Sequence, residues 1–582
     1  MTKKRSTISR RSAASSWYNS WTVYIVLAAY RITSAVNLHP GYLHPDELFQ
    51  SVEIAASVSY PNVCTFKTWE FQTSGPGPVR SYASIWPLFK IPIELTRTFL
   101  PAPLNDTYTS KELVRRILLP MRIFTLFLSF IIDLFILWLS RKISASSPLC
   151  HRPPLALLLF SSMAYGGLVW GSRTLSNVWE EIFVCIFCLL SQQVGILSLL
   201  LEACVFVWAS FIRPSFALFV FPFAILQLYN FIRSSNHLRI FCVHIPLSAA
   251  AAVLVGLMLV YLDTQHFAPH ANISQPTSWV VTPLRFLRYN SAKEKLAEHG
   301  LHPWYAYFFI HWPLMVTPPV MVAAFWPHFR QKAPTLKYAC WTSLILATTV
   351  FSIIPHKEGR FLLPLLPIAL VLGAQNMESY FADGKHSRWF LLLAIQWCAV
   401  QALLTIFWDF LHQAGLIPLL SSLESAEATI SKAVDVTIFY KTYMPPRFPF
   451  GVSSNRSFDF HSCLPFPPHE NICPSIIDLA GRPISDLFSL LECIKSRAHD
   501  EMILRLVMPG TVASRNLQWY NFGELLLTEK FFPHISTENL PKFSLPRCLA
   551  GSSLAECLSK YWAELVSQAS LHSYIVRLNT RS

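Results

Sequence analysis

The sequence predicts an all-α membrane protein whose helices cross the bilayer many times. Of its 582 residues, 53% are hydrophobic and only 14% are charged, whereas a water-soluble domain of this size carries roughly 25% charged residues. Apolar stretches of spanning or near-spanning length recur along the chain. About eleven transmembrane helices are therefore expected, over residues 17–36, 114–140, 154–172, 178–195, 197–212, 215–232, 241–262, 304–325, 338–355, 361–377 and 389–411.

The first stretch follows a basic N-terminus that holds Lys3, Lys4, Arg5, Arg10 and Arg11. No small-residue cleavage site closes the stretch before His44, so an uncleaved anchor with a cytosolic N-terminus is expected. Farther along, Arg213-Pro214 interrupts one long apolar region. Proline ends a helix and arginine is costly in lipid, so this pair predicts a loop between two short helices.

Loop charges then assign the two faces of the membrane. Alternate loops are short and basic, as expected on the cytosolic face: Arg141-Lys142, Arg233 to Arg239, His328 to Lys337 and Lys385 to Arg388. The other face receives three N-glycosylation sequons, at Asn105, Asn272 and Asn455. These positions predict a cytosolic N-terminus over 1–16, a membrane domain over 17–412 and a luminal C-terminal region over 413–582.

The formal net charge of +14 does not indicate nucleic-acid binding. The basic residues are scattered through short loops between apolar stretches, whereas a nucleic-acid interface concentrates them on one face. We therefore expect no nucleic-acid partner.

The most informative polar residues are His44, Asp46 and Glu47, directly after the first apolar stretch. Acids at a membrane edge are costly and usually functional. Adjacent residues on a helix or turn do not face the same way, so Asp46 and Glu47 are expected to differ in role. One would accept a proton from a substrate hydroxyl, and His44 would orient a neighbour. The alternative is a structural helix cap by Asp46 after Pro45.

A second cluster, His356-Lys357-Glu358-Gly359-Arg360-Phe361, lies between two apolar stretches on the luminal side. His356, Lys357 and Arg360 around Glu358 suit a phosphate attached to a lipid, because Arg offers paired contacts and Lys a point charge. The alternative is a loop whose basic side chains reach the lipid headgroups. Its luminal position counts against that reading, since positive charge is favoured on the cytosolic face.

Arg173, together with Glu180-Glu181, and Arg213 are the third and fourth candidates for substrate binding. Each lies at a predicted luminal helix end, where capping and ion pairing are ordinary alternatives.

The cysteines, and the absence of several known sequence motifs, restrict the kinds of site that this protein could contain. Cys64 and five cysteines of the C-terminal region could form disulfides in an oxidising lumen: Cys463, Cys473, Cys493, Cys548 and Cys557. The sequence has no P-loop, dinucleotide fingerprint or Gly-x-Ser-x-Gly elbow. It also lacks a zinc-type spacing and an Asp-x-Asp metal motif, so no cofactor or metal is expected. A lipid monophosphate donor held by basic side chains is favoured.

These motifs together resemble glycosyltransferase family 22, the multispanning mannosyltransferases of the endoplasmic reticulum. His356 to Phe361 is similar to the family's His-Lys-Glu-x-Arg-Phe signature. His44-Pro45-Asp46-Glu47 with Phe49-Gln50-Ser51 resembles its glycosylphosphatidylinositol (GPI) branch. Further segments resemble the members of that branch that add a fourth mannose: 171–177, 296–303, 411–415 and 443–447.

The resemblance implies a GT-C fold in the endoplasmic reticulum membrane with a luminal active site. It implies dolichyl-phosphate mannose as donor and a GPI-precursor glycolipid as acceptor, with α-1,2 transfer to the third mannose. The donor is β-linked and the product α-linked, so the implied mechanism is inverting. Asp46 would be the base, while Lys357, Arg360 and His356 would stabilise the phosphate leaving group.

Other functions were left open by the sequence. A third GPI mannosyltransferase or an N-glycan mannosyltransferase of the same family would use the same donor with another acceptor. A transporter predicts repeated helices and charges deep within spans, and neither is seen in the sequence. An inactive scaffold that retains the motifs is a further alternative.

Overall fold

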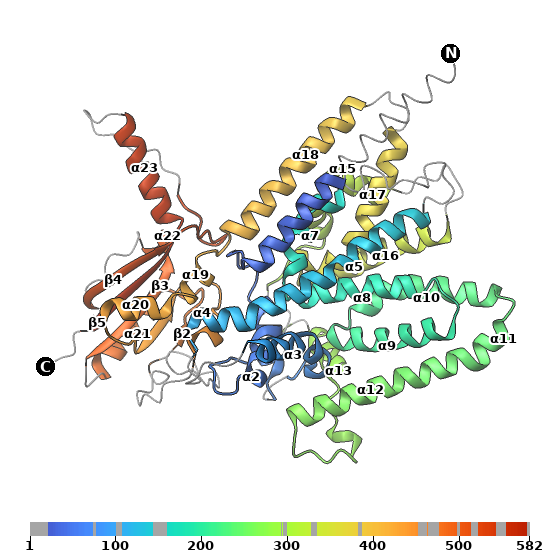
Figure 1. Cartoon of the computed structure of the whole chain (residues 1–582), viewed down its shortest axis with the longest axis horizontal. Coiled ribbons are helices and arrows are strands. Elements are labelled where there is room, and N and C mark those ends of the chain that lie inside the picture. The colour runs from blue at the N-terminus through green and yellow to red at the C-terminus, as the bar shows by residue number, and fades with distance from the viewer. Residues whose placement is uncertain are drawn as a thin grey trace. The chain divides into compact units, whose positions relative to one another are not determined.

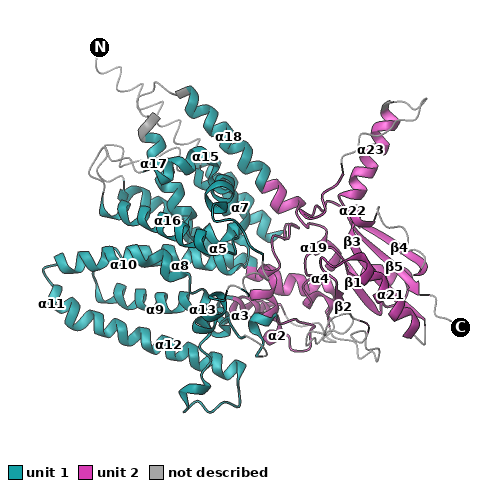
Figure 2. Cartoon of the chain, turned by 180° about the vertical axis from the view of Figure 1, so that it is seen from behind, with its two compact units in different colours: residues 1–37, 68–88, 122–404 teal, residues 38–67, 89–121, 405–582 magenta. Residues whose placement is uncertain are grey.

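The computed structural model describes residues 21–73, 77–100, 108–143, 160–292, 294, 300–326, 334–381, 387–451, 463, 476–497, 501–513, 522–542 and 554–578. The chain divides into two compact units, which Figure 2 colours separately. Unit 1 covers Met1–Asn37, Thr68–Leu88 and Arg122–Leu404, and unit 2 covers Leu38–Lys67, Phe89–Met121 and Thr405–Ser582. Unit 2 therefore combines the C-terminal region with two segments from the first fifth of the chain. The predicted domain boundaries at 16 and 412 stay predictions.

The described residues contain seven helical segments that are long and apolar enough to cross a membrane: Ser110–Ile143, Phe216–Arg233, His237–Phe267, Tyr307–Phe325, Thr335–Ile353, Gly359–Glu378 and Arg388–Leu411. Two shorter apolar helices, Trp21–Val36 and Ile196–Ile212, accompany them. The predicted multi-pass membrane protein is thus confirmed. A count of eleven spans stays a prediction, and part of the expected stretch 154–172 lies outside the described residues.

Most of the helices belong to unit 1 (Figure 2), and Figure 1 labels them along the chain. Their bounds are α3 (Tyr82–Phe99, ending in unit 2), α5 (Leu119–Ile143), α7 (Tyr165–Val169), α8 (Ser176–Leu190), α9 (Ile196–Ile212), α10 (Phe216–Arg233), α11 (His237–Arg239), α12 (Ile245–Phe267), α13 (Thr282–Asn290), α15 (Trp312–Phe325), α16 (Thr335–Ile353), α17 (Leu366–Phe381) and α18 (Ser387–Ile406, ending at unit 2). Helix α9 packs along α12, α10 along α16, and α15 along α17.

Short helical turns connect these helices. They are η2 (Trp69–Phe71), η4 (Trp170–Ser172), η5 (Ile240–His244), η6 (Pro276–Ser278), η7 (Tyr307–His311) and η8 (Gly359–Leu365). The predicted break at Arg213-Pro214 is confirmed, because α9 ends at Ile212 and α10 begins at Phe216. This break places the Arg213 side chain at a helix end rather than in mid-span.

Unit 2 is not all-α, which corrects the predicted fold class for this part of the chain. It contains a five-stranded sheet in the order β2-β1-β3-β5-β4, with strands β1 (Val436–Phe439), β2 (Ile476–Asp478), β3 (Met502–Pro509), β4 (Gly523–Phe531) and β5 (Leu571–Leu578). Its helices and turns are η1 (Leu48–Val52), α2 (Glu53–Ser59), α4 (Ser110–Leu113), η3 (Val114–Leu118), η9 (Phe407–Leu411), α19 (Leu416–Leu420), α20 (Leu423–Ile430), η10 (Phe448–Phe450), α21 (Ile484–Arg497), α22 (Gly510–Ala513) and α23 (Leu554–Gln568).

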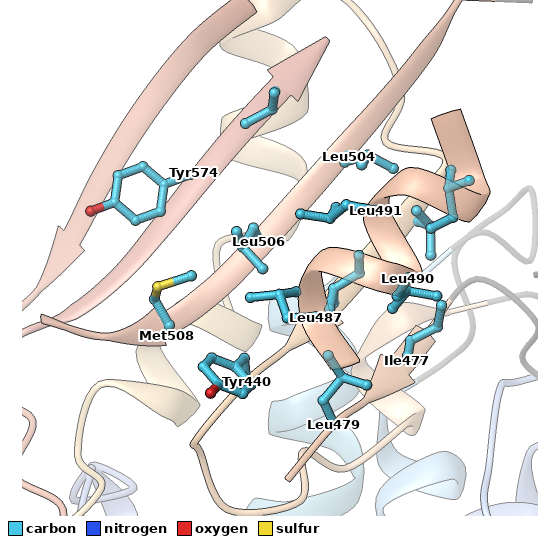
Figure 3. Close-up of a cluster of buried hydrophobic side chains, with 14 of the residues drawn as sticks. Tyr440, Ile477, Leu479, Leu487, Leu490, Leu491, Leu504, Leu506, Met508 and Tyr574 are labelled. Carbon is cyan, nitrogen blue, oxygen red and sulfur yellow. The ribbon is translucent and has the colours of Figure 1, made fainter. Parts of the chain in front are cut away.

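The sheet is mixed and buries side chains on both faces. Strand β1 runs parallel to β2 and β3, whereas β5 is antiparallel to β3 and β4. Successive side chains of a strand point to opposite faces. Leu504 and Leu506 of β3 accordingly pack against Leu487 and Leu491 of α21 (Figure 3). On the other face, Ile503 packs with Ile575 of β5 and Ala426 of α20.

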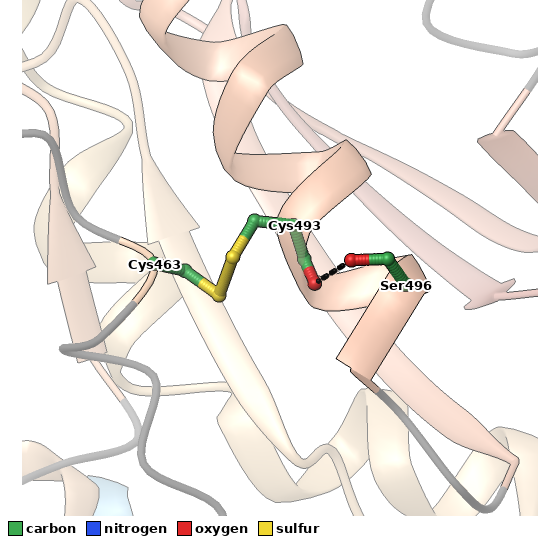
Figure 4. Close-up of a disulfide and its surroundings, with 3 residues drawn as sticks. All are labelled: Cys463, Cys493 and Ser496. Atoms are coloured by element: carbon green, nitrogen blue, oxygen red, sulfur yellow. Dashed lines mark hydrogen bonds between the residues drawn. A yellow bond between two sulfur atoms is a disulfide. The ribbon is translucent and has the colours of Figure 1, made fainter.

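Disulfides occur in unit 2, as expected for six cysteines in an oxidising compartment. Cys463 is bonded to Cys493 of α21 (Figure 4), and Cys64 and Cys557 are disulfide-bonded as well. The described cysteines of unit 1 are free thiols: Cys185, Cys188, Cys204, Cys242, Cys340 and Cys398.

Candidate active site

The segment that carries the predicted base is fixed by the end of the last apolar helix, and all of these residues belong to unit 2. The Tyr42 amide donates to the His412 carbonyl at 3.0 Å, and His412 Nδ1 donates to the Tyr42 carbonyl at 2.9 Å. The Gly41 amide donates to the Asp409 carbonyl at 2.9 Å. A Cβ atom at Gly41 would collide with the backbone carbonyls of Trp408 and Asp409, so this close approach requires glycine.

Asp46 lies at the start of the helical turn η1 with a partly exposed, oriented carboxylate. Its side chain is 27% exposed. Oδ2 accepts a hydrogen bond from Gln50 Nε2 at 2.6 Å, and Oδ1 lies 3.4 Å from His44 Nδ1. The Asp46 amide donates to the same His44 nitrogen at 3.1 Å. His44 therefore orients the Asp46 segment by accepting a hydrogen bond, and the carboxylate is held while it stays accessible.

Glu47 is fully buried, with no exposed side-chain surface. It is the residue before η1, yet its side chain makes no capping bond to that turn. The two adjacent carboxylates therefore sit in different surroundings, one accessible and one buried. The Asp46 carboxylate is therefore accessible to solvent, whereas that of Glu47 is not.

The carboxylate of Glu53 connects its own helix, α2, with the segments around Phe66 and Arg447. The sequence analysis assigned no role to this residue. Its carboxylate is completely buried. Oε2 accepts from the Phe66 amide at 2.9 Å, and Oε1 accepts from the Arg447 and Phe448 amides. Burial raises the pKa of Glu53 to about 7, although the three amide donors act in the opposite direction. No local pattern could reveal this, because Arg447 is 394 positions away.

The same arrangement brings residues 443–447 to the predicted base. Tyr42 Oη donates to the Met444 carbonyl at 3.0 Å. The Tyr443 ring lies 6.0 Å from the Tyr42 ring, 6.4 Å from His44 and 5.3 Å from His412, between centroids. Burial lowers the pKa of His412 to about 4, so this histidine is neutral and serves as a fixed donor.

The second predicted cluster forms around Glu358 in unit 1. Glu358 Oε1 lies 2.9 Å from His356 Nε2. Arg360 grips the same carboxylate through Nε at 2.5 Å and Nη2 at 2.9 Å. The hydrogen bond to Glu358 raises the pKa of His356, against the opposing effect of burial. The predicted grouping of cationic side chains around one carboxylate is therefore seen for His356 and Arg360.

Lys357 turns away from this carboxylate. Its Nζ donates to the carbonyls of Ile354 at 2.5 Å and His302 at 3.3 Å, and the residue is 2% exposed. Burial lowers the pKa of the Lys357 ammonium. The sequence analysis assigned no role to His302, yet its Nδ1 also accepts a hydrogen bond from the Lys357 amide at 3.3 Å. Tyr307 Oη similarly accepts the Glu358 amide at 3.3 Å, so both residues position the loop.

Arg213 and Arg360 lie near the same aromatic ring, that of Phe361. The guanidinium carbons of Arg213 and Arg360 lie 5.2 Å and 5.8 Å from the centroid of Phe361. Arg213 Nε forms an ion pair with Glu180 Oε2 at 2.9 Å, and Ser215 donates to Glu180 Oε1 at 2.6 Å. The fourth predicted binding residue, Arg173, is buried just before α8.

Of the three sequons, only Asn272 belongs to the described residues. It is exposed in the loop after α12, and its Oδ1 accepts the Ser274 amide at 3.1 Å. Asn105 and Asn455 lie outside the described residues. Within the described ranges there is no group of three or more His, Cys, Asp or Glu side chains that could hold a metal ion.

The sequence matches one family of known proteins. The model of the Alg9-like mannosyltransferase family matches residues 22–450. The chain belongs to this family. It is thus a glycosyltransferase that transfers mannose, and its residues 22–450 include both clusters described above.

Several curated relatives share most of this chain. GPI mannosyltransferase 4 of Aspergillus oryzae is 30% identical over 75% of this chain and 79% of its own length. The proteins of that name from Emericella nidulans and Drosophila melanogaster are 26% and 24% identical over 85% and 89% of this chain, and 86% of their own lengths. ArnT from Cupriavidus metallidurans, solved bound to undecaprenyl phosphate, superimposes over 87% of this chain and 95% of its own, with a TM-score of 0.45 at 10% identity. This degree of structural similarity supports no conclusion about the fold or the function of the chain.

Proposed function

We propose that this Alg9-like mannosyltransferase adds the fourth mannose of a GPI precursor. Mannose would pass from dolichyl-phosphate mannose to the third mannose of the precursor, in α-1,2 linkage. The observation that carries the proposal is the oriented, accessible Asp46 carboxylate in a chain of this family. Relatives named GPI mannosyltransferase 4 support the acceptor, as do the segments 171–177, 411–415 and 443–447.

Asp46 acts as the general base in this proposal. It takes the proton of the acceptor 2-hydroxyl while the oxygen of that hydroxyl bonds to the anomeric carbon of the donor mannose. The bond from that carbon to the phosphate oxygen breaks in the same displacement, and the phosphate leaves with the electron pair. Gln50 holds the carboxylate in place by donating to Oδ2, and His44 holds the Asp46 backbone by accepting its amide. Glu47 is proposed as a buried support for the Asp46 loop.

The dolichyl phosphate is bound by the basic cluster of unit 1. Arg360 and Arg213 share the Phe361 ring, and the raised pKa of His356 favours its charged form. Positive charge fixed beforehand stabilises the charge that develops on a leaving phosphate without reorganisation. Glu358 orients His356 and Arg360, Lys357 fixes the loop backbone, and Arg173 is proposed to contact the donor as well.

A luminal active site in the endoplasmic reticulum follows from the same proposal. Disulfides persist in oxidising compartments, and the bonded cysteines that the structure describes belong to unit 2, together with Asp46. A GT-C arrangement of the helices, with about eleven spans, is part of this proposal.

Transfer of labelled mannose in microsomes tests the function. Dolichyl-phosphate mannose is offered with GPI precursors that carry two, three or four mannoses. The precursor with three mannoses should be elongated, and the added mannose should be removed by an α-1,2-mannosidase. Elongation of the precursor with two mannoses would instead identify a third GPI mannosyltransferase. Transfer to an N-glycan precursor would identify an enzyme of the N-glycan branch.

A further inference from the structure

Arg80 lies in the loop that follows η2 in unit 1, a position to which the proposed function gives no role. The residue is 9% exposed. Its Nε donates to Glu70 Oε1 at 2.9 Å, while its amide donates to the Glu70 carbonyl at 3.2 Å. Its guanidinium carbon lies 5.5 Å from the centroid of the Phe286 ring. Contacts with Glu70 and Phe286 therefore fix both the backbone and the side chain of Arg80 in a buried position.

The backbone that carries Arg80 is fixed on both sides. Ser81 Oγ accepts the Ser84 amide at 3.0 Å and so caps the start of α3. Asp263, completely buried, accepts the Ala83 amide at 2.8 Å and the Thr282 hydroxyl at 3.0 Å. A rigid backbone on this side, together with the contacts of the side chain to Glu70 and Phe286, orients the Arg80 guanidinium as a precise binding group requires.

Arg80 shares one arrangement with Arg213 and Arg360. In each, Nε faces a glutamate oxygen: Glu70 at 2.9 Å, Glu180 at 2.9 Å and Glu358 at 2.5 Å. In Arg80 this contact fixes the plane of the guanidinium from the Nε edge. The Nη1 atom of Arg80 is buried and has no hydrogen-bond partner within the described ranges. A buried donor of this kind is destabilising unless a partner accepts its hydrogen bond.

Arg80 and Arg360 both act electrostatically on Arg213. Burial lowers the pKa of Arg213, and the positive charges of Arg80 and Arg360 lower it further, against the effect of Glu180. Arg80 likewise acts on the Glu180 carboxylate.

We propose that Arg80 is a third guanidinium of the site for the donor phosphate, together with Arg213 and Arg360. Its Nη1 donates to a phosphate oxygen of the polyprenyl phosphate. The inference deepens the proposed function and rests on it. GPI precursors also carry phosphates, so the experiment distinguishes the donor phosphate from that of the acceptor.

The purified full-length protein is compared with Arg80→Gln, Arg80→Lys and two controls. Arg285→Gln is the matched control, since Arg285 is a partly buried arginine that donates to the Gly77 carbonyl of the same loop at 3.0 Å. Glu70→Gln removes the ion-pair partner and leaves the charge of Arg80 in place. Binding of a short-chain polyprenyl phosphate is followed by the shift in melting temperature, and KM is measured for donor and acceptor.

Arg80→Gln should weaken binding of the polyprenyl phosphate and raise KM for the donor by about ten- to a hundredfold, with KM for the acceptor within about twofold. Arg80→Lys should recover part of the loss. Arg285→Gln should keep phosphate affinity within about threefold. Glu70→Gln should lower phosphate affinity less than Arg80→Gln does, because the charge of Arg80 remains.

Equal phosphate affinity in Arg80→Gln and the parent would overturn the inference. So would equal stability losses in Arg80→Gln and Glu70→Gln without any change in phosphate affinity, since Arg80 would then be only an ion-pair partner. A rise in KM for the acceptor alone would assign Arg80 to the acceptor phosphate. If the parent binds polyprenyl phosphate but does not elongate the precursor with three mannoses, the proposed function fails while the phosphate site stands.

Discussion

Tyr42 and His412 hold each other by two reciprocal hydrogen bonds, although 370 positions separate them in the sequence. Each residue donates a hydrogen bond to the backbone carbonyl of the other. These two bonds fix the segment before Asp46 much as a neighbouring strand fixes a short β-strand. The predicted base thus takes its position from the far end of the membrane-spanning region.

His412→Phe should lower the free energy of unfolding by about 1–3 kcal/mol, because the ring packing is kept while the buried Tyr42 carbonyl loses its donor. Denaturant unfolding of the purified protein measures the change. His270→Phe, at an exposed histidine, is the control and should have little effect. Equal stability of the His412 variant and the parent would show that this side-chain bond contributes nothing measurable.

Asp46→Asn should abolish mannose transfer with expression and melting temperature unchanged. The substitution keeps the volume and an acceptor for Gln50 but removes the base. Transfer of labelled mannose in microsomes is the measurement, and Asp486→Asn, in the helix α21 of unit 2, is the matched control. Near-normal transfer by Asp46→Asn would exclude Asp46 as the base.

Arg360→Lys should reduce transfer by about ten- to a hundredfold although the charge is kept. A point donor cannot replace the paired contacts that Arg360 makes to Glu358. The loss corresponds to roughly 1.5–3 kcal/mol. Excess dolichyl-phosphate mannose should partly rescue the variant. Rescue by excess acceptor alone would place Arg360 at the acceptor.

Glu53 should make stability depend on pH. Its pKa is about 7 in the folded protein against an ordinary 4.5. The folded state therefore binds the proton more tightly, and this contribution to stability is present below about pH 4.5 and is lost as the pH rises through about 7. The melting temperature of the parent relative to Glu53→Gln should fall over this range. A pH-independent difference would contradict the raised pKa.

Asn272 should carry a glycan, since it is exposed in a loop and lies on the predicted luminal face. Treatment with endoglycosidase should increase the mobility of the parent, and Asn272→Gln should remove that part of the shift. Because a sequon need not be occupied, labelling of an introduced cysteine at 272 is the second measurement. A cytosolic position of residue 272 would overturn the predicted sidedness.

The sequence predicts those features that depend on short-range pattern. Arg213-Pro214 ends a helix because proline does so locally, and the grouping of His356 and Arg360 about Glu358 follows from their nearness in the chain. The sheet was missed because β3 and β5 are buried on both faces and read as short apolar runs, which periodicity cannot tell from helix. Glu53, His302 and Arg80 were missed because their roles come from partners brought together only by folding.

The position of β5 in the sheet of unit 2 also determines when the support of the Asp46 segment can form during synthesis. Gly415, three residues after His412, lies against Leu571 of β5 and donates its amide to His534. Strand β5 pairs with β3 and β4 and so belongs to the middle of the sheet. At about 5–20 residues per second, a ribosome reaches β5 roughly half a minute to two minutes after it has made Tyr42.

The segment around Asp46 is therefore translated long before β5, the strand on which its support at Gly415 packs. A product that stops before Leu571 would contain every apolar helix and each residue of both clusters, yet it would lack the strand against which Gly415 packs. We therefore expect no mannose transfer until β5 has been synthesised and has paired in the sheet.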